Sequence, residues 1–143
     1  NTQGSTIYYN QETGTDQVNA GNIATAIPAF IESGDFDITQ KRSNTGQAVG
    51  TPDLRGDGEY IMRISRFIPD FITQTGDTKV SFTTRAYPNS TPAVKEFTIN
   101  SSKTFQSTRI RARSVALKIS NTAVNQDWKL GTFRLDIAPG GLR

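Results

Sequence analysis

The chain has 143 residues, enough for one domain with a hydrophobic core, and its 16 basic and 13 acidic residues give a net charge of +3. It contains neither histidine nor cysteine, which excludes a Cys/His zinc site, a disulfide, a thiol nucleophile and a Ser-His-Asp triad. No apolar run approaches the roughly 20 residues that span a bilayer, and no signal peptide is visible, so we expect no membrane insertion. Because the chain begins at Asn1 rather than Met, we expect it to be processed or to be part of a longer polypeptide.

The first third of the chain is polar and rich in turn-forming residues. We expect residues 1–28 to form an extended or partner-ordered N-terminal segment, with GTDQVNAGN (14–22) as a loop. IPAFIESGDFDI (27–38) indicates two extended pieces broken at Ser33-Gly34-Asp35, since Pro28 argues against a helix. The Gly-rich stretch 41–59 predicts a long exposed loop.

The remainder alternates between polar and apolar residues in the manner of a β protein. EYIMRIS (59–65), KVSFTTRAY (79–87), AVKEFTI (93–99) and WKLGTFRLDI (128–137) each predict a strand. Turns are expected at Pro69-Asp70 and at Thr75-Gly76-Asp77, and residues 138–143 are expected to be a flexible tail. This spacing predicts an all-β fold, an antiparallel β-sandwich or barrel-like domain of six to eight strands, as a single β domain over residues 29–143.

TRIRARSVALKIS (108–120) carries the most unusual pattern, with arginines at alternate positions leading into alternate aliphatic residues. As one strand it would be roughly 40 Å long, with Arg109, Arg111 and Arg113 about 7 Å apart on one face, unless a bulge interrupts it near Ser114. That spacing is close to the phosphate repeat of an extended nucleic-acid strand, but the aromatic stacking platforms of single-strand binders are missing. We therefore favour pairing with carboxylates of a neighbouring strand or subunit, and name the three arginines as candidate interface residues.

Other candidate motifs have simpler explanations. Arg55-Gly56-Asp57 matches the integrin-adhesion tripeptide and lies in a predicted loop. We name Arg55 and Asp57 only as candidate interface residues. Two clusters of three acidic residues each flank a turn. They are Glu32, Asp35 and Asp37, and Asp53, Asp57 and Glu59. Neither cluster has the alternate-ligand spacing of an EF-hand, so we expect no metal, cofactor or catalytic residue. The single tryptophan, Trp128, is expected to anchor the core or its rim with its N–H paired.

A family likeness rests on an ordered series of motifs. They are ESGDFDI (32–38), MRISRFIPDF (62–71), GDTKVSFTTRAYP (76–88), TRIRARSVALKIS (108–120) and WKLGTFRLDIAPGGLR (128–143). The series resembles the C-terminal part of the large structural proteins that build the tail tube, often called the nozzle or hub, of short-tailed bacteriophages. The likeness covers most of residues 29–143, whereas residues 1–28 and 41–59 have no counterpart in it.

The resemblance implies a non-enzymatic virion protein, assembled in the host cytoplasm and located in the phage tail. Its expected partners are copies of itself in a ring around the DNA channel and adjacent tail or portal proteins, with any DNA contact being non-specific. An alternative function is a receptor- or carbohydrate-binding β module of a virion, for which Tyr8, Tyr9 and Trp128 offer aromatic side chains. Tyr8 and Tyr9 are adjacent on a predicted strand and so face opposite ways, which weakens a shared platform.

Overall fold

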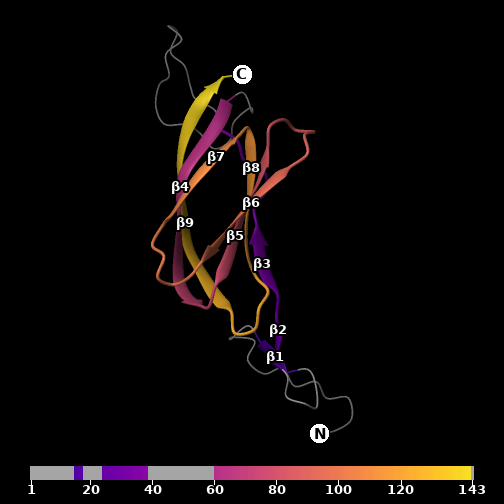
Figure 1. Cartoon of the computed structure of the whole chain (residues 1–143), viewed down its shortest axis with the longest axis vertical. Coiled ribbons are helices and arrows are strands. Elements are labelled where there is room, and N and C mark those ends of the chain that lie inside the picture. Colours follow the sequence, from indigo (N-terminus) through magenta and orange to yellow (C-terminus); the bar gives the residue numbers. More distant parts are fainter. Residues whose placement is uncertain (1–14, 18–23, 39–59, 143) are drawn as a thin grey trace.

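The computed structural model describes residues 15–17, 24–38 and 60–142, and everything in it that is regular is β-strand. Two antiparallel sheets carry seven strands and face each other as a sandwich (Figure 1). The predicted all-β fold class is confirmed.

The first sheet has four strands in the order β3-β8-β5-β6. Its strands are β3 (Ala29–Glu32), β5 (Thr78–Arg85), β6 (Ala93–Ile99) and β8 (Ser114–Asn121). The predicted break after Glu32 is present, because β3 ends there. Beyond it, the Ser33 N–H still donates to the carbonyl of Leu117 at 2.8 Å, and an isolated bridge joins Phe36 to Val115 of β8.

The second sheet has three strands in the order β7-β4-β9. Its strands are β4 (Tyr60–Thr75), β7 (Gln106–Ala112) and β9 (Asp127–Leu142). The register of β4 with both of its neighbours shifts between Ile64 and Arg66. Ser65 and Arg66 are therefore both exposed, and Phe67 returns to the interior.

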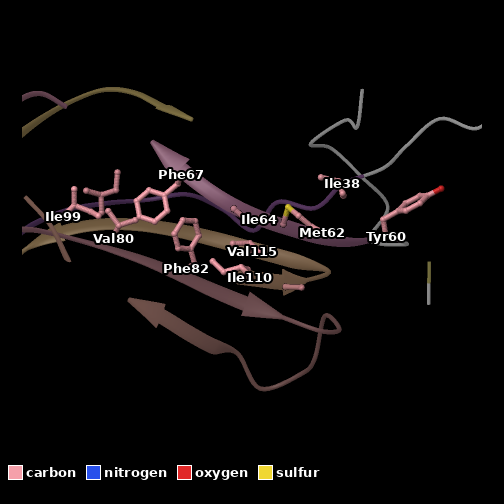
Figure 2. Packing of buried hydrophobic residues seen from close by; sticks show 12 residues of the cluster. Ile38, Tyr60, Met62, Ile64, Phe67, Val80, Phe82, Ile99, Ile110 and Val115 are labelled. Atoms are coloured by element: carbon pink, nitrogen blue, oxygen red, sulfur yellow. The ribbon is translucent and has the colours of Figure 1, made fainter. Parts of the chain in front are cut away.

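The core lies between the two sheets and has an aromatic centre (Figure 2). Phe67 on β4 is fully buried, with its ring centroid 5.3 Å from that of Phe82 on β5 and 5.4 Å from that of Phe97 on β6. The ring of Phe133 on β9 stacks on Phe67 at 5.5 Å. The inward-facing residues of the predicted alternations thus form the layer that holds the sheets together.

Two prolines predicted to end strands lie inside them. β4 continues through Pro69 and β9 continues through Pro139, so the predicted turn at Pro69-Asp70 and the predicted flexible tail at 138–142 are both wrong. β7 pairs with β4 only as far as Phe67, so the missing N–H of Pro69 lies where β4 has no second neighbour. Pro139 lies on an edge strand, where proline is likewise tolerated.

The arginine-rich segment is not one strand. β7 and β8 belong to different sheets, and the chain passes from one to the other at Arg113, whose N–H donates to the carbonyl of Arg85 at 3.0 Å. The predicted single strand of residues 108–120 is therefore wrong, although the predicted interruption near Ser114 falls at this crossing. Burial changes parity there, from Ile110 and Ala112 on β7 to Val115 and Ile119 on β8.

Before the sandwich, β1 (Thr15–Gln17) and β2 (Ala24–Ala26) pair as a separate two-stranded sheet. The prediction of a loop over 14–22 is thus wrong for residues 15–17. The predicted long loop at 41–59 lies outside the described residues, as does most of the segment 1–28.

Candidate functional site: an arginine face

Three arginines meet on the outer side of the three-stranded sheet. Arg63 on β4 is the register partner of Arg111 on β7, and Arg109 lies two residues along β7 on the same side. Their chain neighbours Ile64, Ile110 and Ala112 are buried in the core, so the alternation of a strand turns the arginines outward. We call Arg63, Arg109 and Arg111 the arginine face.

Within the described residues, no carboxylate forms an ion pair with any member of the arginine face. The other end of the same outer surface differs, because Arg66 pairs with Asp136 at 2.6 Å and Arg134 pairs with Asp70 at 3.0 Å. Like charges placed directly opposite each other across two strands are destabilising. The arginine face therefore costs the isolated chain stability that an anionic partner would restore.

The surface beside the arginine face is hollowed on both sides. One hollow of about 590 Å³ lies between the arginines and Ala138, Pro139 and Gly140 of β9. A second, of about 610 Å³, extends toward β6, whose Lys95 Nζ donates to the carbonyl oxygen of Arg109 at 2.8 Å. Lysine at this position adds positive charge and also caps a backbone acceptor on the sheet edge, a common protection against unwanted strand pairing.

Arg113 does not join the arginine face. It lies half-buried at the crossing between the sheets, with its guanidinium carbon 5.4 Å from the ring centroid of Tyr87. The structure therefore brings together two of the three predicted arginines and adds Arg63, which sequence reasoning missed. Strand register was needed to find Arg63, since it lies 46 residues before Arg109 in the sequence.

The acidic turn residues form ion pairs within the described chain. Asp35 accepts from Arg85 Nη1 at 2.6 Å, and Glu32 lies 3.4 Å from Lys118 Nζ. The described segments hold no group of three acidic side chains placed to bind a metal ion. The other two candidate interface residues, Arg55 and Asp57, lie outside them.

Trp128 takes the predicted anchoring role. It is half-buried, its ring packs near Phe71 at a centroid distance of 6.3 Å, and its Nε1 donates to Asn121 Oδ1 at 3.2 Å. A tryptophan held this way on both sides contributes to the rim of the core.

Comparison with known proteins places the chain in no family, since no protein-family model matches it and no curated protein matches its sequence. In the described segments there is no helix long and apolar enough to cross a membrane.

Proposed function

We propose that the chain is a non-enzymatic structural component of a virion tail, a nozzle or hub subunit or domain that assembles with copies of itself into a ring around the DNA channel. In this proposal the arginine face docks on acidic side chains of the neighbouring subunit. The resemblance of the motif series 32–143 to tail-tube proteins supports the virion assignment. The observation that carries the docking proposal is the set of arginines without carboxylate partners on two adjacent strands.

Arginine suits such an interface because its planar guanidinium binds carboxylates through two parallel hydrogen bonds and so fixes their orientation. A ring requires a heterologous contact, in which one surface of a subunit meets a different surface of the next. A face of one charge sign cannot pair with itself, so it fits a heterologous contact and opposes a two-fold symmetric one.

The test is the mass of the full chain in solution, measured by light scattering at low and at high salt. We expect a discrete oligomer at low salt that weakens as salt screens the arginines. Arg111→Glu should give a folded 15.7 kDa monomer, as judged by an unchanged circular dichroism spectrum. Lys129→Glu is the matched control, since Lys129 is exposed on β9 away from the arginine face and the charge change is the same.

Two outcomes would overturn the proposal. The first is a wild-type monomer at every salt concentration, and the second is an intact oligomer formed by Arg111→Glu. Retention of a monomer on DNA, falling steeply with salt, would assign the arginine face to phosphates instead.

A further inference from the structure

The outer surface of the four-stranded sheet carries a groove on the other side of the molecule's core from the arginine face. It has a volume of about 620 Å³ and is lined by residues from all four strands. Strand register places Phe30, Ser120, Lys79 and Thr98 in one row across this surface, and Glu32, Lys118, Ser81 and Glu96 in the next. We call this feature the sheet groove.

Side-chain size explains why the sheet groove is hollow. Its two central strands contribute small residues, Ser81 and Thr83 from β5 and Ser120 from β8. The two long side chains of these strands reach outward, Lys118 to Glu32 on β3 at 3.4 Å and Lys79 to Glu96 on β6 at 3.2 Å. The ion pairs thus form the walls and leave the middle open.

Ser81 gives the floor of the sheet groove a hydroxyl that is open to a ligand. Its side chain lines the groove and the residue is only 6% exposed, yet its hydroxyl makes no hydrogen bond to any residue the structure describes. Thr108 Oγ1 is the one described side-chain atom that is buried without a partner, so Ser81 Oγ stays within reach of water in the groove. A ligand that lies in the groove and carries its own hydroxyl groups would replace water as the hydrogen-bond partner of Ser81.

The charges, the hydroxyl-lined floor and the apolar edges of the sheet groove indicate which class of ligand it can bind. Its two lysines are paired with two glutamates and Asp77 lines it as a further carboxylate, so the surface does not favour a polyanion. Its floor is made of hydroxyls, which an apolar helix would leave unpaired. Exposed apolar side chains stand at both edges, Phe30 on β3 at 65% and Val94 on β6 at 56%. Lys118 Nζ lies 4.5 Å from the Phe30 ring centroid and holds that ring beside the groove.

We propose that the sheet groove binds a short neutral oligosaccharide. The Phe30 ring packs against the apolar face of one sugar ring, as aromatic side chains with an amphipathic ligand do. The hydroxyls of Ser81, Thr83 and Ser120 exchange hydrogen bonds with sugar hydroxyls, because each can both donate and accept. From Lys79 to Thr83 the groove extends roughly 13 Å along β5, which suits a chain of a few sugars.

The test uses the full chain and a panel of cello-, malto-, laminari-, manno- and chito-oligosaccharides. Saturation-transfer NMR identifies the bound sugar, and isothermal titration calorimetry measures its affinity. We expect saturable binding to at least one member, weakened roughly tenfold by Phe30→Ala, since loss of an aromatic contact of about 1.4 kcal/mol corresponds to that factor. Ser81→Ala should weaken binding with the fold intact.

Ile72→Ala is the matched control, because Ile72 is similarly exposed, at 63%, but lies on β4 in the other sheet. Arg111→Glu should bind sugar as the wild type does, which keeps this test independent of ring assembly. Absence of binding across the panel, or equal binding by wild type and Phe30→Ala, would overturn the proposal. Binding lost in Arg111→Glu and kept in Phe30→Ala would place the ligand on the arginine face and would overturn it too.

Discussion

Thr108 is the one buried side chain in the described part of the chain whose polar atom has no hydrogen-bond partner. It lies on the inward side of β7, two residues before Ile110, and is 7% exposed. Its Oγ1 has lost water on folding without gaining a protein acceptor or donor. Such a group lowers stability by about 1–3 kcal/mol relative to a satisfied one.

Thr108→Val should therefore make the protein more stable. Valine keeps the β-branched shape that suits a strand and replaces the hydroxyl with a methyl group. We expect the free energy of unfolding to rise by about 1 kcal/mol, measured by urea denaturation. Thr132→Val, at an exposed position of β9, is the control and should change the free energy by less than about 0.5 kcal/mol. A less stable Thr108→Val protein would show that the hydroxyl is satisfied, for example by a buried water.

The direction of a side chain could be predicted from the sequence where it depends on neighbours along the chain. Which side chains meet could not be predicted, because that depends on strand register. The outward direction of Arg109 and Arg111 follows from alternation within β7. Their meeting with Arg63 depends on how β4 pairs with β7, including the register shift between Ile64 and Arg66, and no local pattern fixes that register. The same holds for the floor of the sheet groove, whose residues come from separate strands.

Among the strands, β4 and β9 form the longest pair. At Gly131 the backbone of β4 lies so near that it leaves no room for a side chain. A Cβ at this position would lie 2.7 Å from the carbonyl oxygen of Asp70 and 3.3 Å from Ile72 Cγ1. The ladder shifts register on either side of Phe71, next to this contact. Glycine here permits the close approach that the irregular stretch of β4 requires.

Gly131→Ala should weaken this ladder, because a backbone carbonyl cannot move aside without disturbing the pairing. We expect a loss of about 1–3 kcal/mol in the free energy of unfolding, the usual cost of overpacking. Gly34→Ala is the matched control, because a Cβ at Gly34 would meet nothing within 4 Å. Equal stability of the two variants would contradict the close contact at Gly131.

Alternation predicted most strands of the sandwich, since one face of each is buried and the side-chain period is two. The wrong predictions came from the two prolines and from the order of the strands in the sheets. Proline cannot donate to a ladder, which predicts breaks at Pro69 and Pro139, but Pro69 lies where β4 has one neighbour and Pro139 lies on an edge strand. Across Arg113 the alternation predicts a continuous strand or a bulge near Ser114, and only the change in burial parity marks the new sheet.

At the scale of the whole molecule, the chain crosses between the two sheets at almost every connection. β4, β7 and β9 make one sheet while β5, β6 and β8 help make the other, so consecutive strands belong to opposite layers except for β5 and β6. Each sheet contains strands from early and late parts of the sequence, so neither sheet can form fully until most of the chain has folded. The aromatic contacts of Phe67 with Phe82 and Phe97 then join the two layers in one core.

This topology predicts that residues 60–142 unfold as one cooperative unit. Trp128 is a suitable probe because it is the only tryptophan in the chain and links β9 to Asn121 of β8 across the two sheets. Its fluorescence should change at the same urea concentration as the circular dichroism of the strands, which is the signature of two-state unfolding. The Arg111→Glu variant allows the comparison in a monomer, free of any effect of subunit dissociation. If tryptophan fluorescence changed well before the strand signal, β9 would be separating from a sheet that survives without it, and the two layers would not depend on each other as the crossings imply.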